Sequence, residues 1–305
     1  MSELVDLSKL PAPDVLEVLN YEELLSQRKE KFISLYPESE REFWRERLQL
    51  ESEPIVKLLE ENCYLQILER QRINDAAKAT MLAYATGSDL DVIAANFNVK
   101  RLVVQAENNN VIPPLKEIKE SDDDLRTRVQ LAFEALSSAG PRKAYTFYAL
   151  SSHGGIADVS VVSPKPAHVT VTVQSHDNHG IPTQEIINAV KIALNDEDVR
   201  PIADRVTVQA VEVFEYQVNA KLHLFRGPQT EPILKAARDN LQRYTQRTKR
   251  IGKDITRSGI YAALHVEGVQ NVEILSPETD LILNDAQSAY CTQSTIETVI
   301  SDEYS

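Results

Sequence analysis

The chain has 305 residues, of which 42% are hydrophobic and 26% charged, and its formal net charge is −13. This length exceeds the usual size of one hydrophobic core and predicts two or three domains. The acidic balance excludes a general nucleic-acid binder, because affinity for DNA or RNA comes largely from Lys and Arg. It disfavours anionic membranes for the same electrostatic reason. We therefore expect a globular protein that uses neither nucleic acid nor membrane as its partner.

The two cysteines, Cys63 and Cys291, do not form a disulfide framework. The N-terminus lacks a secretory signal core, and no apolar run approaches the roughly 20 residues needed to span a bilayer. These features predict a protein that is made and kept in a reducing cytoplasm, unless it leaves as part of a particle.

The first hundred residues carry a helical pattern, with Asp14 well placed to cap the first helix. The predicted helices cover residues 14–36 and 39–50, a long stretch from about Pro54 to residue 84, and residues 88–97. The third would be about 45 Å long at 1.5 Å per residue. It carries apolar residues on more than one face: Leu58, Leu59, Leu65, Ile67 and Leu68. We expect part of this helix to lie in a bundle with another chain; an ordinary intramolecular three-helix bundle is the alternative.

Three consecutive aspartates open the next helix, predicted over residues 121–136. Their side chains diverge by about 100° per residue on a helix, so they cannot converge on one metal ion. Ser121 is placed to cap the helix, and carboxylates in the first turn are stabilised by the helix dipole. The pattern therefore indicates capping rather than a metal site.

Strand patterns dominate the remainder of the chain. Period-2 alternation predicts strands at 158–162, 167–174, 205–214 and 216–224, which together would form a first sheet. Helices are predicted at 183–194, 231–247 and 258–264, followed by a strand at 269–275. A possible late strand at 295–300 lies in a polar tail.

The fold class that follows is α+β and multidomain. The predicted organisation is an N-terminal helical region, a linker, two α+β domains and a C-terminal tail, over residues 1–103, 104–120, 121–215, 216–284 and 285–305.

One segment is written twice. Gly155-Ile156-Ala157-Asp158-Val159-Ser160-Val161-Val162-Ser163-Pro164 reappears as Gly268-Val269-Gln270-Asn271-Val272-Glu273-Ile274-Leu275-Ser276-Pro277. Each copy follows a helical pattern and reads as a glycine turn and then a strand stopped by proline. The repetition suggests a scaffold of repeated modules rather than one catalytic centre.

The only cluster that resembles a metal or acid/base site is His176-Asp177-Asn178-His179. A metal-dependent hydrolase using His176, Asp177 and His179 is the alternative function. A zinc site needs three or four converging ligands, however, and no second cluster supplies them. The sequence also lacks the GxSxG, GxxxxGK[ST] and GxGxxG motifs. A solvated turn is the preferred interpretation, and no catalytic residue, cofactor or metal site is predicted.

A basic cluster stands out against the acidic chain and includes Arg243, Arg247 and Arg250. It is suited to docking an acidic face of a neighbouring subunit, including another copy of this protein. It is equally suited to compensating the dipole at the end of the helix that begins near Glu231. Both interpretations remain open.

Several segments together resemble the baseplate protein J family of contractile-tailed phages and phage-tail-like bacteriocins. The resemblance covers about residues 50 to 292 and rests on the order and spacing of its motifs. These include Thr86-Gly87-Ser88-Asp89-Leu90-Asp91, Glu120-Ser121-Asp122-Asp123-Asp124-Leu125-Arg126, Asp196-Glu197-Asp198-Val199-Arg200-Pro201 and Ile260-Tyr261-Ala262-Ala263-Leu264.

The resemblance implies a structural component of the baseplate wedge and not an enzyme. It implies that a second copy of the chain and a smaller wedge protein join it in a helical core bundle. Neighbouring wedges would complete a six-fold ring around the hub, beside sheath-initiator and hub proteins, and the ring would rearrange on sheath contraction. Such a protein would be assembled in the bacterial cytoplasm and would end in a virion or a released tail-like particle. Leu58, Leu59, Leu65, Ile67, Leu68, Arg243, Arg247 and Arg250 are the expected interface residues.

Overall fold

The computed structural model describes residues 4–137, 140–197, 199–225 and 230–300, and mixes helices with sheets. The chain divides into two compact units, Met1–Asn96 and Phe97–Ser305. Residues 301–305 of the predicted tail and Asp198 of the predicted turn lie outside the described residues.

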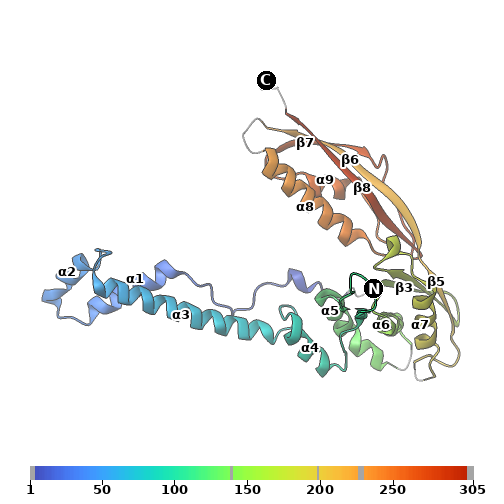
Figure 1. Cartoon of the computed structure of the whole chain (residues 1–305), viewed down its shortest axis with the longest axis horizontal. Helices are drawn as coiled ribbons and strands as arrows, with labels where there is room; N and C mark the ends of the chain where they lie inside the picture. Colours follow the sequence, from blue (N-terminus) through green and yellow to red (C-terminus); the bar gives the residue numbers. More distant parts are fainter. Residues whose placement is uncertain (1–3, 138–139, 198, 226–229, 301–305) are drawn as a thin grey trace. The chain divides into compact units, whose positions relative to one another are not determined.

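The first unit is helical. Its elements are η1 (Leu7–Lys9), α1 (Tyr21–Ser34), α2 (Glu38–Arg47), α3 (Pro54–Ala79) and α4 (Gly87–Asn96). Figure 1 shows α1 lying along α3, and the two helices are in contact. Its helical core is small and centres on Ile33, Leu48 and Val56. Cys63 is buried, as a small apolar residue would be.

Two helix boundaries differ from the prediction. Asp14 does not cap α1: the side chain of Asn20 accepts hydrogen bonds from the amides of Glu22 and Glu23, and the helix begins at Tyr21. The segment before it is held instead by buried Asn74, which exchanges two hydrogen bonds with the Glu17 backbone at 3.0 and 2.9 Å. The helix α3 ends at Ala79, so it has 26 residues and a length of about 39 Å rather than 45 Å.

The second unit begins with a small hairpin and a capped helix. Strands β1 (Val103–Gln105) and β2 (Ile118–Lys119) pair antiparallel, so the predicted linker at 104–120 contains regular structure. The helix α5 (Asp122–Leu131) continues as the 3-10 helix η2 (Ala132–Leu136). The Ser121 hydroxyl accepts from the Asp124 amide at 3.2 Å. The predicted cap is therefore confirmed.

The first sheet has the order β3-β4-β5. Its strands are β3 (Ile156–Lys165), β4 (His168–Ser175) and β5 (Arg205–Ala210), and its helices are α6 (Arg142–Ser152) and α7 (Gln184–Leu194). The 3-10 turn η3 (Asn178–Gly180) follows β4. The central strand β4 is antiparallel to β3 and parallel to β5. Alternate residues such as Val171 and Val173 are buried against Val190 and Leu194 of α7.

The second sheet has the order β7-β6-β8. Its strands are β6 (Glu212–Leu224), β7 (Val269–Ser276) and β8 (Gln287–Ile300), and its helices are α8 (Thr230–Thr248) and α9 (Arg257–Leu264). Figure 1 shows α8 and α9 on one face of this sheet. Leu222 of β6 and Leu264 of α9 are fully buried in the core between the sheet and these helices. Each such leucine stabilises the fold by about 1.5–3 kcal/mol.

Two strand assignments from the sequence were wrong. Residues 216–224 do not belong to the first sheet, since β6 is the central strand of the second. Only Val211 separates β5 from β6, so the chain passes directly from one sheet into the next. The predicted tail is also wrong for residues 287–294, whereas the possible late strand at 295–300 is confirmed. Residues 287–300 form β8 and pair parallel with β6 along its whole length.

The two copies of the duplicated segment lie at comparable places in the two sheets. The first forms β3 after α6, and the second forms β7 after α9. Both strands are edge strands that pair antiparallel with the central strand of their sheet. In both, the third residue of the strand accepts a hydrogen bond from the next amide: Asp158 from Val159, and Asn271 from Val272, each at 2.9 Å.

Candidate functional site

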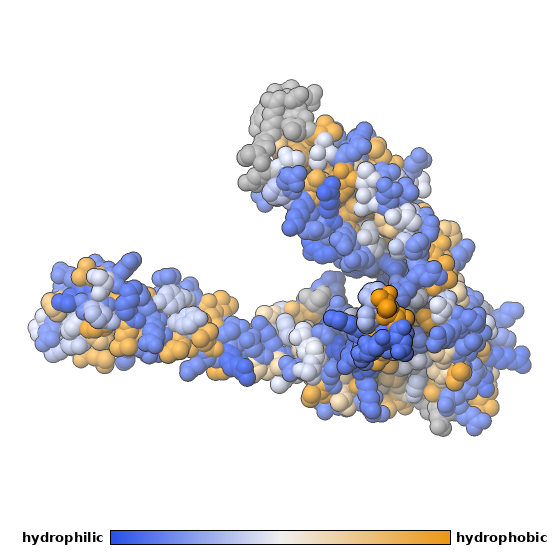
Figure 2. All heavy atoms as spheres, viewed as in Figure 1, coloured by the Kyte–Doolittle hydropathy of each residue, from blue (hydrophilic) through white to orange (hydrophobic). Residues whose placement is uncertain are grey.

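The apolar residues predicted on the long helix divide into two groups. Leu59 packs against the small core of the first unit, and Ile67 lines a hollow beside α1. Leu58, Leu65 and Leu68 remain 57%, 49% and 48% exposed. Figure 2 shows hydrophobic residues gathered on the surface of this unit.

The exposed leucines follow helical spacing. Leu65 and Leu68 lie seven and ten residues after Leu58, which places all three on one side of α3. Exposed apolar side chains that share one side of a helix are typical of interaction sites. We call Leu58, Leu65 and Leu68 the leucine row.

The three basic residues predicted at an interface do not act together. Arg243 and Arg247 are exposed on α8 and border a hollow shared with Ala262 and Ala263 of α9. Arg250 follows that helix and is engaged within the chain: its guanidinium bonds the Ala157 carbonyl and lies 3.9 Å from Asp124 Oδ1.

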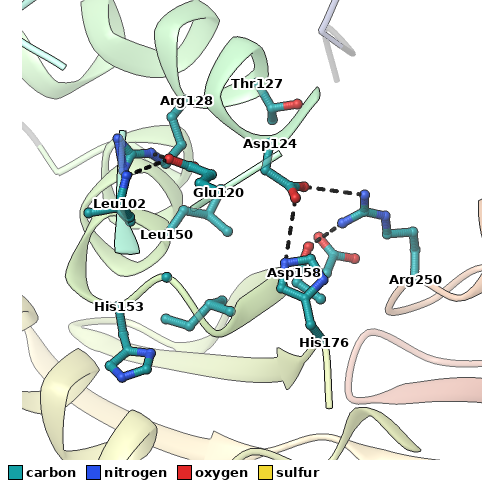
Figure 3. A pocket seen from close by; sticks show the side chains of 13 residues that line it. Leu102, Glu120, Asp124, Thr127, Arg128, Leu150, His153, Asp158, His176 and Arg250 are labelled. Carbon is teal, nitrogen blue, oxygen red and sulfur yellow. Dashed lines mark hydrogen bonds and ion pairs between the residues drawn. The ribbon is translucent and has the colours of Figure 1, made fainter. Parts of the chain in front are cut away.

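A cavity of about 280 Å³ lies in the second unit beside α5 (Figure 3). One wall holds a buried ion pair, with Arg128 Nε 3.2 Å from Glu120 Oε1 and both side chains at most 5% exposed. Glu120 also accepts from the Leu102 amide at 3.0 Å, and Arg128 donates to the Lys100 carbonyl at 2.6 Å. Burial raises the pKa of Glu120 and lowers the pKa of Arg128. The ion pair thus connects α5 to the segment just before strand β1.

The opposite wall of the cavity connects the two sheets. Figure 3 shows His176 and Arg250 directed toward Asp124, with His176 Nε2 3.5 Å from Asp124 Oδ2. The Ile251 amide donates to Asp158 at 2.9 Å, and Lys249 Nζ donates to the His176 carbonyl at 3.2 Å. We call Asp124, Asp158, His176, Lys249 and Arg250 the polar junction.

Burial dominates the electrostatics of this junction. It raises the pKa of Asp158, although the Arg250 charge acts in the opposite direction. It also lowers the pKa of Lys249. The charged side chains that line the cavity therefore form contacts between different helices, strands and loops of the second unit.

The two histidines of the predicted turn are directed to different partners. His176 faces Asp124, whereas His179 stacks on Tyr290 with ring centroids 4.4 Å apart and lies 3.1 Å from Glu215. Among the described residues, no group of three or more His, Cys, Asp and Glu side chains could hold a metal ion. Because hydrolytic zinc requires at least three protein ligands, this arrangement gives the hydrolase alternative no support.

Sequence reasoning missed Glu120, Arg128 and Asp158. Their signal was weak: Arg128 is a charged residue beside buried Leu125 and Val129 on α5, and Asp158 sits within an otherwise apolar and small-residue strand. No described helix has both the length and the apolar character needed to cross a bilayer.

An exposed leucine row, two separately cored sheets and a cavity lined by paired charges favour a structural protein. Comparison with known proteins agrees. Residues 51–108, 137–210 and 216–297 match the Baseplate J-like N-terminal, central and C-terminal domains. The chain is 51% identical to baseplate protein J of Escherichia phage P2 over 300 residues, which cover 98% of this chain and 99% of that protein.

The chain therefore belongs to the baseplate protein J family. Its role is structural, as a component of the baseplate of a contractile phage tail and hence of the virion. Family membership favours this role over an enzymatic one.

Proposed function

We propose that the chain is a wedge component of the baseplate. In this proposal the first unit forms a helical core bundle with a second copy and a smaller wedge protein. The sheets of the second unit contact neighbouring wedges in a six-fold ring around the hub, near the sheath-initiator and hub proteins. The ring rearranges when the sheath contracts.

The leucine row carries the proposal. Three large apolar side chains stay about half exposed on one side of α3, and the helices of the same unit do not cover them. Burying them against another helix would contribute about 25 cal/mol per Å² of apolar surface. A helical partner is the natural cover, because the spacings of seven and three residues within the row match helix packing.

The polar junction supports rearrangement. Within the second unit, the module of the second sheet is attached to that of the first sheet by charged and polar contacts. Examples are Arg250 with Asp124 and Lys249 with His176. Each sheet keeps its own separate apolar core. Polar contacts between separately cored bodies can be exchanged for others without unfolding either body.

Arg243 and Arg247 support a contact with an acidic neighbour. Both are exposed on α8, while the chain as a whole carries a net charge of −13. Complementary charge of this kind sets orientation and association rate more than affinity. The duplicated helix and edge strand fit the same view, since two comparable modules would present two comparable surfaces to a ring.

Co-expression with the wedge partner tests the proposal. The full chain should be recovered in a complex whose mass exceeds that of one copy. Leu65→Asp should abolish this complex, because it places a charge in the leucine row. The matched control, Gln71→Asp, adds the same charge at an exposed polar position of α3 and should leave the complex intact. Recovery of the native chain as a monomer beside every wedge protein would contradict the proposal.

A further inference from the structure

The two sheets of the second unit end in edge strands, and a bare strand edge offers unpaired amides and carbonyls to another strand. Two of these edges, β3 and β7, are the copies of the duplicated segment. Their backbones are occupied in the same manner. On β3, Asp158 accepts from the Val159 amide and Arg250 binds the Ala157 carbonyl.

The edge of β7 is closed by an equivalent pair of contacts. Asn271 accepts from the Val272 amide at 2.9 Å, and Arg257 Nη2 donates to the Ile274 carbonyl at 3.2 Å. An amide and a carbonyl of each edge are thus satisfied by side chains. Such contacts discourage pairing with a further strand.

The edge of β8 lacks this protection. From Thr292 to Val299 every residue except Ile296 is exposed. Among the described residues, the only side chain bonded to the backbone of this segment is that of Cys291, which belongs to β8 itself. The segment contains no proline and is rich in β-branched residues, which favour strands. It therefore has the properties of a pairing strand.

The charge of β8 indicates its occupant. Residues 287–296 contain no charged side chain, in a chain that is 26% charged with a net charge of −13. Two copies of an acidic chain repel one another, so a neutral surface is where they can approach. A strongly basic foreign strand would find only Glu297 as a counter-charge within Thr292–Val299. The strand of a second copy fits better.

We propose that β8 pairs antiparallel with β8 of a second copy of this chain, joining two C-terminal sheets into one. The inference deepens the proposed function and rests on it, because a baseplate part present in several copies supplies the second strand. Such a contact is isologous, with the same surface on both subunits.

A two-fold axis through Thr295 gives a compatible register. It places Glu297 opposite Gln293 of the second copy, and Ile296 opposite Ser294. Gln293, Thr295 and Glu297 all border the same hollow on the sheet, so opposed residues lie on a common face. The carboxylate meets an amide, and no like charges are opposed.

Disulfide trapping in the full chain tests the pairing. In a background with Cys63→Ala and Cys291→Ala, Thr295→Cys places two thiols opposite each other across the axis. Directly opposed residues in an antiparallel pair have Cα atoms about 4.5–5.5 Å apart, which suits a disulfide. Under mild oxidation this variant should form a linked dimer at least tenfold faster than Gln270→Cys, whose site is exposed on β7. Equal rates would overturn the proposal.

A charge variant provides a second measurement. Thr295→Lys places two like charges on the axis and should raise the dimer dissociation constant at least tenfold in sedimentation equilibrium, while Gln270→Lys should not. Retention of dimers by Thr295→Lys would overturn the pairing. The wedge complex formed through the leucine row is scored in the same preparations. If that complex persists and no trapping occurs at position 295, the β8 pairing is wrong and the proposed function stands. If trapping occurs and no wedge complex forms, the β8 pairing stands and the proposed function is wrong.

Discussion

The two units of this chain differ in how completely they bury their apolar side chains. In the second unit, each sheet is covered by helices and holds a core with fully buried residues such as Val171 and Leu222. In the first unit, three leucines of α3 stay about half exposed, and no residue of α2 is fully buried. Each sheet therefore has an apolar core of its own, whereas we propose that partners cover the exposed leucines of the helical unit. Substitutions should separate these two roles.

The largest expected effect is the loss of the buried ion pair. Arg128→Leu leaves Glu120 buried without its counter-charge and should lower the free energy of unfolding by about 3–5 kcal/mol. Denaturant unfolding followed by circular dichroism measures this. Lys191→Leu, at an exposed position of α7, should stay within about 0.5 kcal/mol. Equal effects would show that the pair does not hold the second unit together.

Truncating one leucine in each unit compares their cores directly. Leu222→Ala opens a cavity in the second sheet and should cost about 2–5 kcal/mol. Leu65→Ala, at a half-exposed position, should change the stability of the isolated chain by no more than about 1 kcal/mol. The same denaturation experiment compares both variants. A large loss at Leu65 would mean that the first unit is already complete by itself.

The duplicated glycines should respond unequally. Gly268 has φ +93°, and an added Cβ would collide with Ile233 Cδ1. Gly268→Ala should therefore cost about 1–3 kcal/mol. Gly155 does not have a left-handed φ, and its added Cβ would lie 3.1 Å from Ile186 Cδ1, so Gly155→Ala should cost less. Thermal unfolding of the two variants gives the order, and a reversed order would contradict this account of the turns.

The smallest effect concerns pH. Burial raises the folded-state pKa of Asp158 above its usual 3.8, so the folded state binds this proton more tightly than the unfolded state does. This contribution to stability is complete below the usual pKa and is lost as pH rises through the raised value. Asp158→Asn, which copies Asn271 of the second repeat, should remove that decline.

The measurement for this last prediction is the unfolding free energy of both proteins from pH 3 upward, about one pH unit apart. The difference between the curves should change across the titration of Asp158. Gln270→Asn, which exchanges one amide for another at an exposed position of β7, serves as the control and should run parallel to the native curve. Parallel curves for Asp158→Asn would show that its carboxyl is not desolvated.

Local features were predictable from sequence, because they depend on neighbours along the chain. Thr183 caps α7 by accepting from the Ile186 amide, and Ser121 caps α5, as short side chains before a helix do. Period-2 alternation found β3 and β4. These signals persist whatever the tertiary arrangement.

Features that depend on distant partners were not predictable. The first part of β8 resembled a polar tail because residues 291–295 carry no large apolar side chain, and its partner β6 lies far away in sequence. The strand β6 was assigned to the wrong sheet because neighbouring strands usually pair. Arg250 looked like a surface charge, and only the fold brings it to Asp124 and Ala157.

We propose that other subunits cover the leucine row in the assembled baseplate. Thiol labelling of Leu65→Cys, in a background with Cys63→Ala and Cys291→Ala, measures this cover by comparing the free chain with intact particles. Labelling should be rapid in the free chain and at least tenfold slower in particles. Equal labelling rates in the two states would contradict it.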